Sequence, residues 1–193
     1  MREKIKDRRI QKTRKALHEA LISLMGQKKY EWIVVQDILD RANVGRSTFY
    51  MHYRDKDGLL MAGLDDLWKT LRDAKTESNP ARKPEKIIQF SLAWFRHTYG
   101  HRHITKTLVG TQVWDRIRER MEGWLIEMIK SEARPLWKRR ISGMNLDLFA
   151  YFLGSSFVNV MTWWLTQKNP VPPEEIDVQF RQLVLPVINA HLD

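Results

Sequence analysis

The amino-acid sequence predicts an all-α protein of about nine helices. Apolar residues recur three and four positions apart along most of the 193 residues, which is the spacing of one face of a helix. No stretch alternates apolar and polar residues in the way that a half-buried strand does. Residues such as Gly26, Gly100 and Pro170 separate these periodic stretches from one another.

Four helices are predicted in the first part of the chain. Their approximate ranges are 10–26, 35–41, 46–53 and 55–77. Lys28 and Lys29 follow the first helix, where cations interact favourably with the helix dipole. The segment 78–84 contains two prolines and an asparagine and breaks the pattern, so it is the predicted linker.

Five further helices are predicted in the second part. They cover about 87–100, 102–109, 113–129 and 145–167, and the last begins at about residue 173. Pro173 is acceptable in a first helical turn, and Glu174 and Glu175 suit the positive end of the helix dipole. Pro186 should kink or weaken this last helix.

The charge of the chain is concentrated at its N-terminus. The net charge is +10, and residues 1–15 hold eight Lys or Arg against two acidic residues. Such an arm suits a polyanion such as DNA, because each neutralised phosphate releases counterions. A solvated tail that aids solubility has the same composition. Charge alone leaves both interpretations open.

The composition excludes several other classes of protein. Cysteine is absent, so the chain has no disulfide and no thiolate metal site. No uninterrupted apolar run approaches the roughly 18 residues that a bilayer span needs. The basic N-terminus is not followed by the apolar segment of a secretory signal. We therefore expect no contact with a membrane and a cytoplasmic location.

Residues 34–53 carry the pattern of two short helices joined by a tight turn. Ile38, Val44 and Phe49 are placed to pack against the first helix of the chain. Asn43 tolerates the left-handed backbone that such a turn requires, and Gly45 can cap the helix that follows. The solvent side of that helix presents hydrogen-bonding groups suited to base edges and phosphates in a major groove: Arg46, Ser47, Thr48, Tyr50 and His52.

This segment resembles the TetR family of transcription regulators. The similarity lies in Thr48-Phe49-Tyr50-Met51-His52-Tyr53, in Lys56, and in the continuation Asp57-Gly58-Leu59-Leu60, and it covers about residues 9–64. Two positions depart from the family pattern. Val34 stands where the family has a threonine that caps the second helix, and Asn43 stands where it has the glycine of the turn.

The resemblance implies the role of each half of the chain. Residues 1–55 would form the basic arm and helix-turn-helix DNA-binding domain, joined by the fourth helix, 55–77, to an effector-binding and dimerisation domain, 78–193. It implies groove contacts from the five residues named above and phosphate contacts from Gln36 and Lys56. It also implies a homodimer that reads a palindromic operator of double-stranded DNA, usually as a repressor.

The helix predicted over 145–167 is apolar nearly all round. A helix of this kind is buried on both faces, and the second face would meet another subunit, with Gly154 and Ser155 allowing close approach. The alternative is that this helix and the last one form the core of a monomer. The sequence leaves both arrangements open.

The effector is the least determined part of the prediction. An apolar pocket could be lined by Trp94, Phe95, Trp114, Met121 and Trp124. Aromatic residues at helical spacing more often form a packed core than a pocket, and some family members respond to protein partners instead. The identity of the effector therefore stays unknown.

Metal binding and catalysis find little support. His97 and His101 have a spacing that could place two imidazoles on one face, but a helix break at Gly100 favours solvated loop histidines, with His103 among them. We expect no metal and no cofactor. The chain has no phosphate-binding glycine loop and no nucleophile with a base, which argues against an enzyme. The alternative function is a helical co-regulator that binds proteins and reads no operator of its own.

Overall fold

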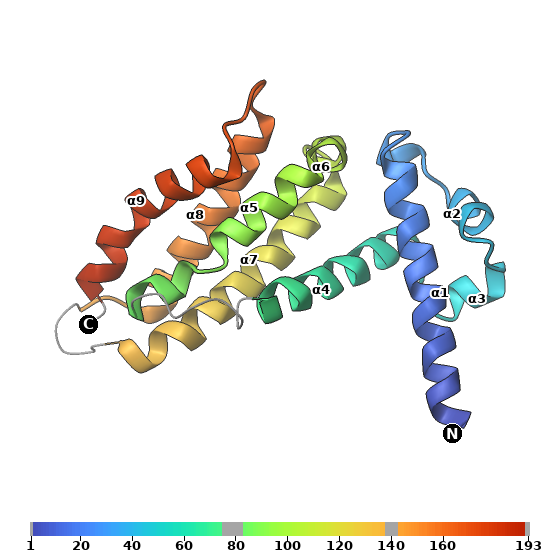
Figure 1. The fold of residues 1–193 in the computed structure, drawn as a ribbon, viewed down its shortest axis with the longest axis horizontal. Coiled ribbons are helices and arrows are strands. Elements are labelled where there is room, and N and C mark those ends of the chain that lie inside the picture. Colours follow the sequence, from blue (N-terminus) through green and yellow to red (C-terminus); the bar gives the residue numbers. More distant parts are fainter. Residues whose placement is uncertain (1, 75–82, 138–142, 192–193) are drawn as a thin grey trace. The chain divides into compact units, whose positions relative to one another are not determined.

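The computed structural model describes residues 2–74, 83–137 and 143–191 (Figure 1). The residues in these ranges form nine α-helices, three short 3₁₀ helices and no strand, which confirms the predicted all-α fold. The chain divides into two compact units, residues 1–68 and 69–193. The dividing point falls inside α4 (Lys56–Ala74), the helix predicted to connect the two domains.

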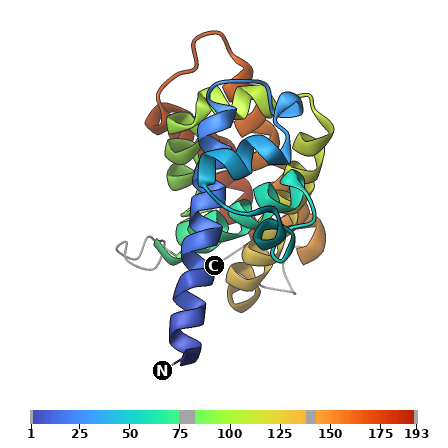
Figure 2. The ribbon, with the colours of Figure 1, turned by 90° about the vertical axis from the view of Figure 1, so that its right-hand side faces the viewer.

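The N-terminal unit is a bundle built on one long helix. Its elements are α1 (Arg2–Met25), η1 (Tyr30–Trp32), α2 (Val35–Ala42), α3 (Arg46–Tyr50) and the first part of α4. Figure 2 shows this unit from the side of α2 and α3, with α2 crossing α1. Its core consists of apolar side chains that are almost completely buried: Leu17, Leu21, Ile33, Ile38, Phe49 and Leu59.

The expectation of a basic arm before the first helix was wrong. The backbone of α1 is helical from Arg2, so the basic residues predicted as an arm lie on its first turns. Arginine, lysine and glutamate are good helix formers, which allows the helix to continue where no apolar stripe marks it. The third helix was predicted to reach residue 53, but α3 ends at Tyr50 and continues as a turn.

The C-terminal unit consists of packed helices around an aromatic core. Its elements are η3 (Lys83–Ile88), α5 (Ser91–Gly100), α6 (Arg102–Leu108), α7 (Gln112–Ala133), η4 (Arg134–Leu136), α8 (Leu146–Thr166) and α9 (Pro173–His191). α7 packs along α8, and α5 packs against α9 (Figure 1). The ring of Phe95 lies 5.0 Å from Phe157, 5.4 Å from Trp164 and 6.2 Å from Phe180, measured between ring centroids.

The predicted role of Gly154 needs correction. Gly154 is buried, and a Cβ at this position would lie 3.2 Å from the side chain of Ile126 in α7. The missing side chain therefore allows α7 and α8 to pack closely within one subunit. It does not provide the close approach to a second subunit that the sequence suggested.

α9 is anchored to α5 by a buried carboxylate. Asp177 is only 5% exposed, and it accepts hydrogen bonds from the hydroxyl of Ser91 and, at 2.7 Å, from Nε of Arg181. Because a buried charge is costly unless it is paired, this network fixes how α9 packs on α5. α9 continues past Pro186 to His191, so the proline does not end the helix.

α8 is the most apolar helix that the structure describes. It is the one helix in those ranges whose length and mean hydropathy would allow it to cross a membrane. Half of its most apolar 18-residue stretch is buried inside the protein. The core helix of a globular domain can have the same length and mean hydropathy. Its buried side packs against α7, as expected for such a core helix.

Candidate nucleic-acid interface

The turn between α2 and α3 has the geometry that the sequence predicted. Asn43 adopts a left-handed backbone, with φ 50° and ψ 50°, and its N–H donates to the carbonyl of Leu39. The N–H of Val44 donates to the same carbonyl at 3.1 Å. Ile38 and Phe49 are completely buried on either side of the turn, and Val44 is half-buried. These contacts fix α3 against the rest of the unit.

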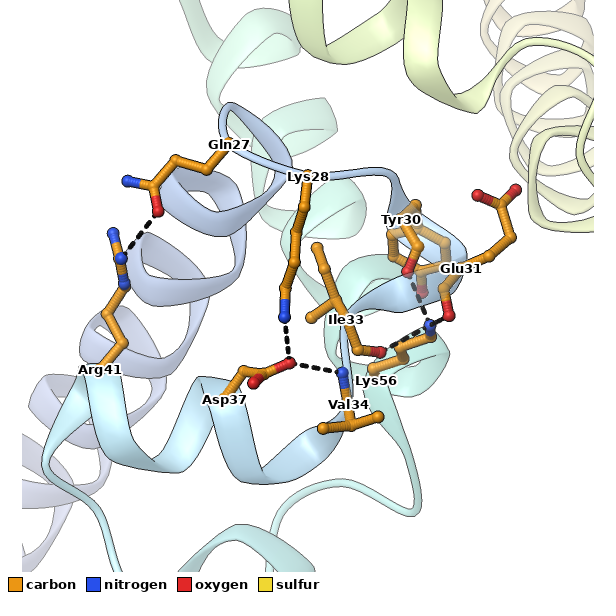
Figure 3. A network of polar contacts seen from close by, with 9 residues as sticks. All are labelled: Gln27, Lys28, Tyr30, Glu31, Ile33, Val34, Asp37, Arg41 and Lys56. Carbon is orange, nitrogen blue, oxygen red and sulfur yellow. Dashed lines mark hydrogen bonds and ion pairs between the residues drawn. The ribbon is translucent and has the colours of Figure 1, made fainter.

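The first turn of α2 is capped from an unexpected position. Val34 has no side-chain acceptor, but its N–H donates to Oδ2 of Asp37 at 2.9 Å. The same oxygen accepts from Nζ of Lys28 at 2.6 Å (Figure 3). The hydrogen bond from Lys28, followed by that from Val34, lowers the pKa of Asp37 below its ordinary value. Asp37 thus supplies one half of a capping box, which offsets part of the lost threonine cap.

Lys56 has a structural role that the sequence did not indicate. Its Nζ donates to the carbonyls of Tyr30 at 2.7 Å, Ile33 at 2.8 Å and Glu31 at 3.3 Å (Figure 3). It also lies 4.5 Å from the centroid of the Tyr30 ring. Partial burial lowers the pKa of Lys56. The ammonium therefore ties the start of α4 to the 3₁₀ segment before α2, and the phosphate contact of Lys56 stays a prediction.

The side chains predicted to face a groove gather on α3 and the turn after it. Arg46, Ser47 and Tyr50 are exposed, whereas Thr48 and His52 are half-buried. The ring of Phe49 packs edge-on against Tyr50, with centroids 5.3 Å apart. This buried neighbour holds Tyr50 at the surface with half of its area open to solvent.

The structure brings Arg46 of α3 together with Gln36 of α2. Nη2 of Arg46 donates to Oε1 of Gln36 at 3.0 Å. The amide Nε2 of Gln36 donates in turn to Oδ1 of Asp40, one turn further along α2, at 2.7 Å. Arg46 and Gln36, two of the predicted DNA-contacting residues, are therefore joined by a hydrogen bond, and Asp40 extends this chain of hydrogen bonds.

Two exposed residues of the N-terminal unit were missed by the sequence analysis. Met51 directly follows α3 and is 73% exposed, and Trp32 lies in η1 and is 66% exposed. Nζ of Lys29 lies 5.4 Å from the centroid of the Trp32 ring. A tryptophan outside any apolar stripe, just before the helix-turn-helix, was the available signal for Trp32.

The sequence matches two family profiles. Residues 17–62 match the profile described as bacterial regulatory proteins of the tetR family. Residues 85–185, more than half of the chain, match a TetR profile described as the transcriptional regulator C-terminal region. The chain belongs to the TetR family. The two profile descriptions identify this family as one of transcriptional regulators.

Relatives of this TetR-family chain include proteins of known sequence and known structure. YxbF, an HTH-type transcriptional regulator of Bacillus subtilis strain 168, is 25% identical over 95% of this chain and 47% of its own length. A TetR transcriptional regulator from Streptococcus agalactiae 2603V is 29% identical, with a TM-score of 0.66 over 94% of this chain and 98% of its own. The chain spans about half the length of the curated relatives it matches.

RolR, solved in complex with its ligand resorcinol, shares the fold. It is 18% identical to this chain, with a TM-score of 0.65 over 93% of this chain and 89% of its own.

The residues predicted to line an effector pocket belong to the C-terminal unit. Trp94, Phe95, Trp114 and Met121 are buried, whereas Trp124 is half-buried beneath the guanidinium of Arg120, 5.5 Å from its ring centroid. Phe95 lies at the centre of the aromatic core. Burial of this kind fits a packed core as well as a pocket, so the pocket stays a prediction.

One of the three histidines departs from the expected solvated loop, whereas His101 and His103 are exposed. His97 lies in α5 and is half-buried, and its ring stacks on that of His101 with centroids 4.4 Å apart. α5 ends at Gly100, where a helix break was predicted. Burial, followed by the charge of His101, lowers the pKa of His97 to about 4. Within the described ranges, no group of three or more His, Asp or Glu side chains could hold a metal ion.

Proposed function

We propose that this TetR-family regulator acts in the cytoplasm as a homodimeric repressor that binds a palindromic operator. The observation that carries the proposal is the exposed polar face of Arg46, Ser47 and Tyr50 on a helix fixed by the left-handed turn at Asn43. Such a helix can enter a major groove, where an arginine can bind guanine through two hydrogen bonds. Thr48 and His52 extend this face, with Gln36 and Lys56 as the proposed phosphate contacts.

The exposed apolar residues of the C-terminal unit support the proposed dimer. Within its described residues, the large apolar side chains that stay exposed all lie on α8 or α9: Leu148, Tyr151, Phe152, Trp163, Val178 and Leu183. Exposed apolar side chains gathered on two helices are typical of a protein interface. A dimer also matches the two-fold symmetry of a palindrome.

A small-molecule effector is proposed as the signal that releases the operator. The buried aromatic cluster around Phe95 offers the apolar surroundings that small ligands prefer. A structural neighbour, RolR, binds resorcinol, which makes small aromatic compounds the first group to test. A ligand that binds the folded protein would raise its melting temperature by mass action. If no compound changes the melting temperature, a protein partner is favoured instead.

Selection of bound DNA from random sequences, followed by competition binding at a fixed salt concentration, tests operator reading. The wild-type protein should enrich a palindrome, and Arg46→Ala should cost about 1–3 kcal/mol and relax the preference at one base position. Lys56→Ala is the contrast, because it should weaken all sequences alike.

Equal affinity for random and selected DNA would overturn the proposal. Binding that needs an added partner protein would identify the chain as a co-regulator. The loss of the threonine cap at Val34 favoured that alternative, and the capping contribution of Asp37 weakens it.

A further inference from the structure

We infer that Asp40 is a positioning residue that sets the orientation of Arg46 through Gln36. The inference rests on the proposed operator reading and deepens it. Asp40 is an exposed residue of α2. It would determine base preference without touching a base.

The argument begins with the asymmetry of the glutamine amide. A glutamine side chain carries a donor on nitrogen and an acceptor on oxygen, and either can face a neighbour after the amide rotates. The carboxylate of Asp40 is an acceptor only, so it selects the orientation in which Nε2 of Gln36 faces it, at 2.7 Å. The amide oxygen must then face the opposite way.

That oxygen accepts from Nη2 of Arg46 at 3.0 Å. If the amide were reversed, its NH₂ group would face the guanidinium, and two donors would oppose each other. Asp40 therefore stabilises the one rotamer of Gln36 that can hold Arg46. The bond occupies one of the five N–H donors of the guanidinium and leaves four for DNA.

Holding Arg46 in place before binding reduces the loss of side-chain freedom on binding. A long side chain that is ordered in the free protein loses less entropy at an interface, and the saving corresponds to roughly a 2- to 12-fold change in affinity. Because Arg46 is the proposed base-reading residue, that change should affect the preference at its base and not the binding to phosphates.

The competing explanation is that Asp40 acts only through its charge. A carboxylate near DNA repels phosphates, and its removal would strengthen binding to every sequence alike. Asp40→Asn and Asp40→Ala separate the two explanations, because both remove the charge, but asparagine keeps an oxygen that can accept from Gln36. Its amide also carries a donor, so it selects the Gln36 rotamer less strongly than the carboxylate does. Glu19→Ala is the matched control, since Glu19 is an exposed carboxylate of α1 outside this chain of hydrogen bonds.

The experiment measures the ratio of affinities for the selected operator and for the operator changed at the base that depends on Arg46. Asp40→Ala should lower this ratio roughly 2- to 12-fold and Asp40→Asn should lower it less, whereas Glu19→Ala should keep it near the wild-type value. Equal ratios in Asp40→Ala and wild type would overturn the inference. So would equal losses in Asp40→Ala and Asp40→Asn.

A second measurement needs no operator. Nuclear magnetic resonance relaxation of the Arg46 Nε–H in the free protein should show an ordered side chain in wild type and a more mobile one in Asp40→Ala, with Asp40→Asn between the two. Unchanged order in Asp40→Ala would contradict the inference. If wild type binds all sequences alike, operator reading fails on its own, and the order of Arg46 still decides the role of Asp40.

Discussion

At the scale of single residues, the backbone at the start of α2 has the geometry of a capping box, but one of the two capping hydrogen bonds is missing. Val34 has the extended conformation of a capping residue, with φ −104° and ψ 158°, and the residue is 56% exposed. The N–H of Asp37 reaches only the carbonyl of Val34, at 3.1 Å. A side-chain acceptor at position 34 would complete the capping box.

Val34→Thr should therefore stabilise the N-terminal unit by about 1 kcal/mol, because threonine has nearly the same shape and adds the missing acceptor. Urea unfolding followed by a probe in this unit would measure the change in free energy. Val34→Ala is the control that alters the side chain without adding an acceptor, and it should give no gain. A threonine variant no more stable than the alanine variant would show that Asp37 alone is a sufficient cap.

At the scale of elements, helical periodicity predicted most of the helices but not all of their ends. α2 and α5 to α9 lie close to their predicted ranges because each buries a regular apolar stripe, as Val113, Ile117 and Met121 do in α7. The start of α1 could not be predicted in this way, because its first turns carry charge instead of a stripe.

The candidate site shows the same limit. The exposed residues of α3 and the turn at Asn43 follow from local sequence. The contacts of Lys56 with carbonyls 23 to 26 residues away depend on how α4 packs, which the sequence pattern does not specify. The capping by Asp37 could have been predicted from the sequence, because Asp37 lies three residues after Val34, which is the spacing of a capping box.

α5 should make the stability of the C-terminal unit depend on pH. The folded state holds the pKa of His97 at about 4, whereas an unfolded histidine has a pKa near 6.5. Between these values the unfolded state binds the extra proton. Stability is therefore fully present above about pH 6.5 and is lost progressively as the pH falls toward 4.

Denaturant unfolding across this pH range would test the effect. His97→Gln should flatten the decline in the free energy of unfolding, even if it lowers stability at every pH. His103→Gln is the control, because His103 is exposed on α6 and should leave the decline unchanged. Parallel declines in His97→Gln and wild type would show that burial of His97 does not cause the pH dependence.

At the scale of the whole molecule, the proposed dimer predicts that a charge on α9 separates the subunits. Leu183 is 71% exposed, so Leu183→Glu should leave the fold of the subunit intact. In a dimer it would bury an unpaired carboxylate, which costs several kcal/mol and shifts the equilibrium toward monomers. Sedimentation or light scattering at micromolar concentration measures the mass directly.

Gln112→Glu is the matched control, because it adds the same charge at an exposed position of α7. This variant should keep the mass of the wild-type assembly. A Leu183→Glu protein that remains dimeric would exclude α9 from the interface at this position. A wild-type protein that is monomeric at these concentrations would contradict the proposed homodimer itself.

α4 has a consequence for how the molecule unfolds. It runs without interruption from Lys56 to Ala74, and the division between the two compact units falls within it. Helix formation is cooperative, because each new turn extends an existing one at low cost whereas a new start is unfavourable. When one unit unfolds, the part of α4 that belongs to that unit no longer packs against it. That part of the helix then unwinds from its end. A heat-capacity scan measures whether the two units unfold in separate transitions or share one through α4.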